Sequence, residues 1–452
     1  MQEKWSKTKI YKLLNLILFT SFISLITFCN SSNITIDPEV EIDNTNKTLV
    51  TTTEDVDTEL ITLEGCKPFK GYFQNTIDCV TGTNFESIIN FDDQVNNIVQ
   101  HNEEFYFILN NGQVFKHNKS NLTNDQIFDF SDKLDPSNEM GGLRGLVFHP
   151  SEAYILISYV KAIDIYSLYV EKIEIDENFN ILSSNIIYRV DDVSIQRNHF
   201  GGHLVWSDFY EGFLLGVGDF YESSAESRLN PDPLDTTKPY GKILLLQSEI
   251  KISTPSISKN NELKNLDNIV AMGLRNSWQF FEYKNYLIIA DVGLSINEEL
   301  NISKLSDKTL NFGWPVYEGL DKSKDIDNIK NYELEITYWQ NSNKNNIDVY
   351  FEDNYEKPVF QYAHNPNEEI YRAAIIGGDI FENLNSNYSQ QIFVAEYLTG
   401  ELFSIDLITR NLSIFEIENL NKNITSLRIY DEDKDELLIS TQNGEILVIS
   451  LP

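Results

Sequence analysis

A short unit recurs along most of this chain: an apolar run, a polar turn that contains Gly, and a second run of alternating apolar residues. Three copies are plain, at residues 105–117, 392–405 and 437–450. Asn-Gly or Thr-Gly joins the two runs in these copies, and Gly and Asn best tolerate the positive φ of tight hairpin turns. The unit therefore predicts antiparallel β-hairpins repeated along the chain.

Less regular copies complete the series. They lie around residues 145–148, 204–215 and 280–289, and with the plain copies they make six units between about residues 90 and 451. A repeat of a few tens of residues, each with two or more antiparallel strands, is typical of a β-propeller. We expect an all-β, six-bladed β-propeller, with a large β-sandwich that has coincidental hairpins as the alternative.

Composition favours strands and excludes some partners. The chain holds 27 Phe, 23 Tyr and 5 Trp, residues enriched in strands. Its 69 acidic residues against 35 basic ones give a formal net charge of -34, which disfavours binding to nucleic acid or to an anionic lipid surface. Neutral, cationic or metallic partners remain.

The N-terminus has the layout of an export signal. Four lysines between residues 4 and 12 precede a largely apolar run at residues 13–28, which is short for a membrane span. Cys29 follows, so that residues 1–29 resemble a bacterial lipoprotein signal whose cysteine is acylated. We expect an exported protein, periplasmic or anchored to the outer membrane by an N-terminal lipid.

Residues 30–84 are expected to form an acidic tether and a lead-in closed by a disulfide. Up to about residue 64 the segment is rich in Thr, Asn, Asp and Glu, the composition of a solvated linker. Cys66 and Cys79 have 12 residues between them and are well placed to pair in an exported chain. Residues 85–452 are then assigned to the propeller.

His199 lies in Asn-His-Phe-Gly-Gly, directly before an apolar strand. A neutral imidazole there could take a proton from an alcohol, because its pKa lies near working pH. Asp219 closes a neighbouring strand and could orient His199. A structural histidine and a turn aspartate are the plain alternatives, and His203 is the local rival for the catalytic role.

Arg275 and Asn276 follow Gly-Leu and offer donors for an anionic cofactor or a developing oxyanion. A surface arginine is the plain alternative. Further on, the Asp-Val-Gly-Leu segment at residues 291–294 precedes Glu298, so carbonyl and carboxylate oxygens of the kind that Ca²⁺ prefers could converge.

Taken in order, these segments resemble the soluble quinoprotein glucose/sorbosone dehydrogenase family, the PQQ-dependent aldose sugar dehydrogenases built on a six-bladed propeller. The resemblance runs from about residue 85 to the C-terminus. The segments that carry it are GLRGLVFHP at 142–150, His199 with Gly201-Gly202, GKIL at 241–244, GLRN at 273–276, DVG at 291–293 and NFGWP at 311–315.

The resemblance implies a role for each matching residue. His199 is then the general base that removes the sugar C1 hydroxyl proton while hydride passes to PQQ, and Asp219 orients it. Arg275 takes part in catalysis and, with Asn276, contacts the cofactor. The metal-binding positions implied for Ca²⁺ are the carbonyls of Gly293 and Leu294, supported by Glu298.

Arg372, just before a Gly-Gly segment, is the remaining candidate for binding PQQ. The resemblance also implies a small sugar substrate and a periplasmic electron acceptor, with the aldose oxidised to its lactone. Two other functions stay open: an inactive propeller that binds a glycan or a partner protein, and a Ca²⁺-dependent lactonase-type hydrolase.

Overall fold

The computed structural model describes residues 60–134, 141–162, 166–191, 198–220, 232–246, 266, 268–322, 355–367, 369–417, 420 and 423–452, with strand β1 (Leu49–Val50). Within these ranges the chain is all-β, with short 3-10 turns at Ser131–Lys133 and Asp232–Leu234. They contain no helix with the length and apolar character needed to span a bilayer. The predicted signal segment at 1–29, including Cys29, lies outside the described residues.

The described strands form six four-stranded blades. Blades 1 to 3 are β4 (Val95–His101), β5 (Glu104–Leu109), β6 (Gln113–Asn118) and β7 (Thr123–Asp129); β8 (Gly142–Phe148), β9 (Tyr154–Ala162), β10 (Tyr166–Ile175) and β11 (Ile181–Asp191); and β12 (Gly201–Ser207), β13 (Gly212–Val217), β14 (Lys242–Leu246) and β15 (Ile269–Met272).

Blades 4 to 6 are β16 (Ser277–Tyr283), β17 (Tyr286–Asp291), β18 (Asn297–Lys304) and β22 (Phe360–Ala363); β23 (Ile375–Ile380), β24 (Gln391–Glu396), β25 (Leu402–Asp406) and β26 (Leu412–Ile417); and β27 (Ile424–Asp431), β28 (Glu436–Thr441), β29 (Glu445–Ser450) and β3 (Thr76–Asn90). Five short strands lie beside these blades: β1, which pairs with β3, and β2 (Gly71–Tyr72), β19 (Leu310–Asn311), β20 (Tyr317–Glu318) and β21 (Asp321–Lys322).

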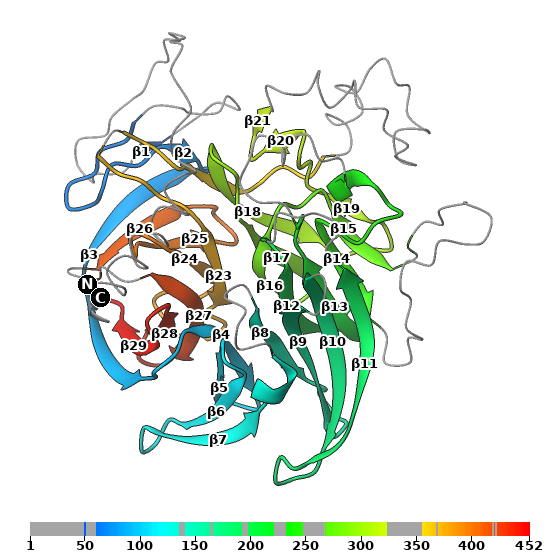
Figure 1. The fold of residues 1–452 in the computed structure, drawn as a ribbon. Coiled ribbons are helices and arrows are strands. Elements are labelled where there is room, and N and C mark those ends of the chain that lie inside the picture. Colours follow the sequence, from blue (N-terminus) through cyan, green and yellow to red (C-terminus); the bar gives the residue numbers. More distant parts are fainter. Residues whose placement is uncertain are drawn as a thin grey trace, which may run out of the picture.

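The innermost strands close into a ring. Contacts run from β4 through β8, β12, β16, β23 and β27 and back to β4, and their labels gather around the centre of the ring in Figure 1. Apolar side chains fill the space between neighbouring blades. One cluster joins Leu156 and Val170 of blade 2 to Leu204 and Phe213 of blade 3. Burying one such side chain stabilises the fold by about 1.5–3 kcal/mol. The predicted six-bladed propeller is confirmed.

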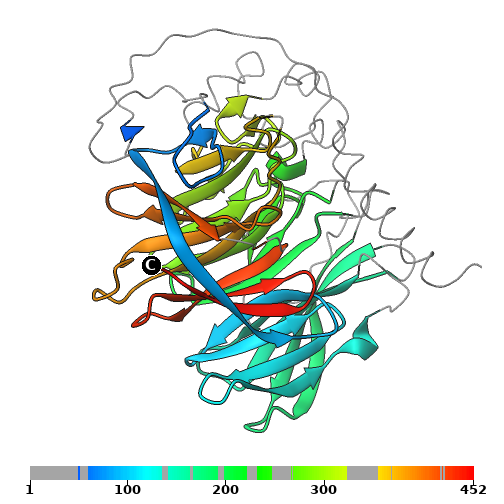
Figure 2. The same ribbon diagram turned by 90° about the vertical axis from the view of Figure 1, so that its left-hand side faces the viewer.

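β3 joins the two ends of the chain. It runs antiparallel to β29 as the outer strand of blade 6 and parallel to β26 of blade 5. Figure 2 shows this blue strand crossing from the orange blade to the red one. The expected domain boundary at residue 85 falls inside β3, so the lead-in continues into the propeller sheet. The predicted Cys66–Cys79 disulfide is confirmed.

The three plain repeat copies are the hairpins β5–β6, β24–β25 and β28–β29. Their turns hold Gly112, Gly400 and Gly444, each with a φ between +71° and +97°. The positive φ explains why glycine stands in these turns.

Candidate active site

The candidate site lies where the innermost strands of blades 3, 4 and 5 begin. The loops before these strands carry His199, Arg275 and Ala374. Hydrogen bonds tie the loops together, because Asp219 N donates to Arg275 O at 2.8 Å and Ala374 N donates to Glu298 Oε1 at 3.0 Å. Loops from three blades therefore meet on one face of the ring, as the sequence predicted for His199 and Arg275.

His199 is held in a left-handed backbone conformation. Its φ is +51°, in a region that costs a non-glycine residue about 1–3 kcal/mol. Its N–H donates to Asn198 Oδ1 at 2.9 Å. Gly218 passes so close that a Cβ atom there would lie 1.9 Å from the His199 carbonyl oxygen. Strain of this kind at a histidine is typical of a functional position.

The imidazole ring of His199 has two defined neighbours. Nδ1 lies 3.1 Å from Oδ1 of the fully buried Asp219 carboxylate, so Nδ1 carries the hydrogen and donates it. Nε2 lies 3.3 Å from Nη2 of Arg275, which can only donate. In this arrangement Nε2 is the unprotonated nitrogen, and its lone pair faces the site.

Arg275 is almost wholly buried, with 3% of its surface exposed. Its Nη1 donates to the carbonyl oxygens of Val292 at 2.9 Å and Gly293 at 2.5 Å. The guanidinium carbon lies 5.8 Å from the centre of the Trp314 ring, within the range of a cation–π contact. Thus Gly293, predicted as a metal ligand, contacts Arg275 through its carbonyl oxygen.

Asp291 fixes the loop that carries Arg275 and Asn276. Its carboxylate accepts the backbone N–H groups of Arg275 at 2.9 Å and Asn276 at 2.8 Å. Burial raises the pKa of Asp291 to about 7, although these hydrogen bonds and the Arg275 cation favour the ionised form. Glu299 lies opposite on β18, and burial together with Asp291 raises its pKa as well. Two adjacent buried carboxyl groups disfavour double ionisation.

Glu298 is a fully buried carboxylate that joins blades 4 and 5. Oε1 accepts hydrogen bonds from His364 Nε2 at 2.6 Å and Ala374 N at 3.0 Å, and Oε2 accepts from Ile375 N at 3.0 Å and Gly293 N at 3.2 Å. Burial alone would raise its pKa, but His364 and the backbone donors hold the pKa of Glu298 below its usual value. This predicted metal ligand is surrounded by donors.

Glu318 fixes the loop after β17. Its Oε1 accepts the N–H groups of residues 294–297, at 2.8, 2.7, 2.7 and 3.3 Å in chain order. Successive backbone N–H groups that converge on one anion form a nest. Leu294, the other predicted metal-binding residue, therefore directs its N–H at a carboxylate of the chain itself.

Arg372 lies in blade 5 with a full set of partners. Nε and Nη2 donate to the two carboxylate oxygens of Glu401 at 2.7 and 2.6 Å, and Nη1 donates to Pro68 O at 3.0 Å. Its side chain is 0% exposed. Arg372 therefore links blade 5 to the lead-in. All three of its guanidinium nitrogens already donate to the chain, so the geometry does not support its predicted contact with a cofactor.

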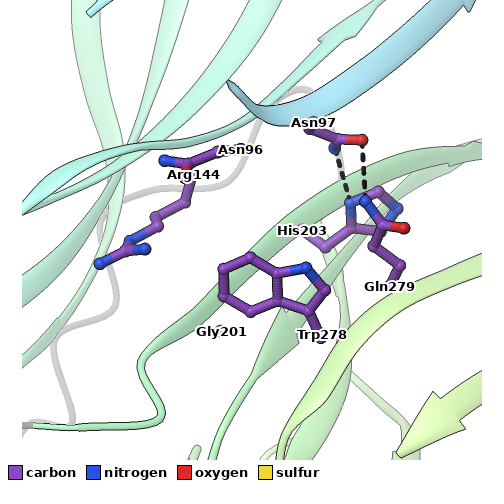
Figure 3. Close-up of a pocket in the computed structure, with 7 residues that line it drawn as sticks. All are labelled: Asn96, Asn97, Arg144, Gly201, His203, Trp278 and Gln279. Atoms are coloured by element: carbon purple, nitrogen blue, oxygen red, sulfur yellow. Dashed lines mark hydrogen bonds between the residues drawn. The ribbon is translucent and has the colours of Figure 1, made fainter. Parts of the chain in front are cut away.

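Polar side chains from four innermost strands fill part of the central channel. Asn97 Nδ2 lies 3.0 Å from His203 Nδ1, and Gln279 Nε2 donates to Asn97 Oδ1 at 3.1 Å and Ser426 Oγ at 2.9 Å. Figure 3 shows the first two contacts. The small cavity beside them is lined by Asn96, Asn97, Arg144, Gly201, His203, Trp278 and Gln279.

His203 belongs to this channel network. Burial, with a smaller effect from Arg428, lowers the pKa of His203 to about 3. Its Nδ1 faces an amide donor, and its Nε2 lies 3.0 Å from the Phe280 carbonyl oxygen, so Nε2 carries the hydrogen. Both ring nitrogens are occupied, and His203 is a structural histidine. Of the two neighbouring histidines, His199 alone faces the site.

Several buried polar atoms of the site have no hydrogen-bond partner within the described residues: Nε of Arg275, Oδ1 of Asn276, Oε2 of Glu299, Nδ1 of His364 and Nε1 of Trp314 among them. Buried polar atoms in proteins are almost always paired, so each one needs an explanation. The first two belong to residues predicted to bind a cofactor.

The sequence reasoning missed several residues that shape the site. His364 and Glu318 were not singled out, and Asp291 was noted only within a motif. Their shared signal is position: His364 directly follows β22, Asp291 ends β17, and Glu318 ends β20. A charged or imidazole side chain at a strand end, next to a loop, is a place where function is often found.

A closed ring of blades with a His–Asp pair facing a buried arginine defines a propeller of enzyme type. The model of the glucose/sorbosone dehydrogenase family matches residues 101–446. The chain belongs to this family, and sugar oxidation in general is thereby supported. No curated protein matches the chain.

Solved structures agree with the fold. The soluble aldose sugar dehydrogenase of Escherichia coli in its apo-form is 17% identical, with a TM-score of 0.57, over 82% of this chain and 100% of that one. An oxidoreductase of Thermus thermophilus, described as a glucose dehydrogenase, is 14% identical, with a TM-score of 0.54, over 81% and 100%. A further glucose dehydrogenase is 13% identical, with a TM-score of 0.57, over 81% and 99%.

Proposed function

We propose that this protein oxidises an aldose sugar at C1 to the lactone, with PQQ as the hydride acceptor. The observation that carries the proposal is the His199 ring, whose Nδ1 is fixed by Asp219 while the lone pair on Nε2 faces the site beside Arg275. A base in this tautomer can take the proton of the C1 hydroxyl.

Each residue then has a defined task. His199 Nε2 accepts the hydroxyl proton, and the Asp219 carboxylate stabilises the imidazolium that forms. The Arg275 cation, 3.3 Å from Nε2, is placed to stabilise negative charge that develops on an acceptor oxygen. Burial of Arg275 and Asp219 keeps these interactions strong, because less water screens them.

The residues present fit a quinone cofactor. The unpartnered Nε of Arg275 and the backbone-fixed amide of Asn276 would hold its polar edge. PQQ, when bound, supplies a quinone that accepts the hydride of C1. A periplasmic electron acceptor and an N-terminal lipid anchor complete the proposal, on the sequence pattern of residues 1–29.

Two of the three residues predicted for Ca²⁺, Gly293 and Glu298, do not fit that ion. The Gly293 carbonyl accepts from a cation, and four donors surround the Glu298 carboxylate. The described residues contain no group of three or more His, Cys, Asp or Glu side chains placed to hold a metal. The proposed mechanism therefore includes no step through calcium, and the same observation gives no support to the lactonase-type hydrolase.

A binding propeller without redox chemistry is the second candidate. It is favoured because other buried cations are already paired within the chain. Arg372 binds Glu401, and Lys242 Nζ donates to the carbonyls of Asp232, Pro233 and Tyr240. PQQ carries three carboxylates, which call for cationic partners.

Reconstitution distinguishes the two candidates. Purified protein mixed with PQQ should reduce a redox dye in the presence of an aldose, tested across a panel of sugars. We expect His199→Ala to lower kcat/KM by about 10²–10⁴-fold, and His101→Ala to leave it unchanged, since His101 ends β4 of blade 1, where its Nε2 lies 2.9 Å from Asn102 Nδ2. If wild-type protein gives no turnover and the quinone absorbance does not change on mixing, the binding propeller is favoured.

A further inference from the structure

We propose that the guanidinium group of Arg275 occupies the place of a divalent cation at this site, so that the positive charge is part of the chain. What this charge does in catalysis depends on the proposed function. The contacts of the loop at residues 291–298 support the inference.

The carbonyl oxygens of this loop already have a cation. Arg275 Nη1 lies 2.5 Å from Gly293 O and 2.9 Å from Val292 O. Ca²⁺ binds oxygen at about 2.3–2.6 Å, so an ion that approached Gly293 O from the side of Arg275 would overlap the guanidinium nitrogen. Two cations side by side in a buried position also repel each other strongly.

The carboxylates around the loop are engaged elsewhere. Glu298 accepts four hydrogen bonds, and Asp291 accepts the N–H groups of Arg275 and Asn276. Glu318 Oε1 is surrounded by the amides of residues 294–297. Ca²⁺ takes six to eight oxygen ligands, usually with carboxylates among them. Here the nearby carboxylates hold the loop and position Arg275.

The position of the guanidinium has a chemical consequence. Its Nη2 faces His199 Nε2 and its Nη1 faces the two carbonyls, so one rigid group joins the base to the loop. Arginine stays charged at any working pH and forms directed hydrogen bonds. A site of this kind keeps its electrophile without a metal in the medium.

Terbium luminescence tests the inference without turnover. Tb³⁺ substitutes for Ca²⁺, and Trp314 lies near the guanidinium, so an ion in this place would emit when tryptophan is excited. The full chain is compared with Arg275→Ala, which frees the carbonyls, and with Arg275→Lys, which keeps a charge there. Trp314→Phe in each background identifies emission from this site among other acidic positions.

We expect no Trp314-dependent emission from wild type or Arg275→Lys, and emission that Ca²⁺ displaces from Arg275→Ala. A melting temperature raised by Ca²⁺ but not by Mg²⁺ in Arg275→Ala, with no such rise in wild type, is the expected second readout. Trp314-dependent, Ca²⁺-displaced emission from wild type overturns the inference, and so does its absence from Arg275→Ala. Dye reduction by the wild type is measured separately, so failure of the proposed function can be told apart from failure of this inference.

Discussion

At the scale of single residues, the site is built from buried charges whose partners decide what they can do. Asp219 and Glu298 are both fully buried carboxylates beside a histidine. His199 directs its Nε2 toward Arg275 and the site, while His364 directs its Nε2 at Glu298. A carboxylate and a histidine thus form the proposed catalytic pair in one case and a link between blades in the other.

Glu396 gives a pH-dependent prediction. Burial raises its pKa to about 8, from an ordinary value of 4.5. Between these values the folded protein keeps a proton that the unfolded chain has released, so the free energy of unfolding falls as pH rises. The loss reaches up to about 1.4 kcal/mol per pH unit.

Glu396→Gln stays neutral and should lack this slope, whatever constant offset the change introduces. Urea unfolding of both proteins at several values between pH 5 and pH 8 measures the difference. Parallel curves for the two proteins across this range would show that Glu396 is ionised in the folded state.

At the scale of elements, close backbone contacts position the proposed catalytic groups. β13 ends at Val217, and Gly218 then passes the His199 carbonyl. Asp219 follows and meets both His199 Nδ1 and the Arg275 carbonyl. The end of one strand therefore aligns His199, the proposed base, with the Asp219 carboxylate.

Gly218→Ala should disturb this alignment. A Cβ atom at that position must displace the His199 carbonyl, so we expect kcat/KM to fall at least about 10²-fold. The melting temperature should change less than the activity does. The matched control is Gly212→Ala at the other end of β13, where the nearest atom is the end of the Leu245 side chain at 2.9 Å. Dye-linked kinetics and thermal melts report both quantities. Equal losses of activity in the two variants would contradict the positioning role.

At the scale of the whole molecule, the ring depends on a lead-in that returns to the last blades. β3 lies between β26 and β29, and the Cys66–Cys79 bond fixes the segment before it. Lys67 N donates to Glu416 Oε1 at 2.6 Å. The buried Arg372 reaches the same segment through Pro68 O.

Replacing both Cys66 and Cys79 by Ser should lower the free energy of unfolding by about 3 kcal/mol, because the short loop they close is freed in the unfolded chain. Cys29→Ser is the control and should leave the free energy of unfolding unchanged. Denaturant unfolding with and without reductant measures the effect. A wild type insensitive to reductant, and as stable as the double variant, would mean that the disulfide does not hold the ring closed.

The sequence predicted the hairpins and the loops of the site but not the partners of its charges. Hairpin turns depend on neighbouring residues, so Asn-Gly in the turns of β5–β6 and β28–β29 could be recognised locally. The pairing of Arg372 with Glu401 and of Glu298 with His364 depends on how separate strands meet. No local pattern indicates that a carboxylate near a glycine loop will be surrounded by backbone donors.

The same limit applies to β3. Residues 76–84 belong to the predicted lead-in because they surround Cys79 of the expected disulfide, while their pairing with β26 and β29 is a contact across most of the chain. Ring closure of this type is a property of the assembled blades.

The most direct test of the account is the rate of dye reduction by the PQQ-reconstituted protein with an aldose that carries deuterium at C1. If the C1–H bond breaks as hydride while His199 takes the hydroxyl proton, the deuterated sugar should react more slowly than the ordinary one, with the lactone as product. A product formed at the same rate from both sugars, without dye reduction, would contradict oxidation at C1.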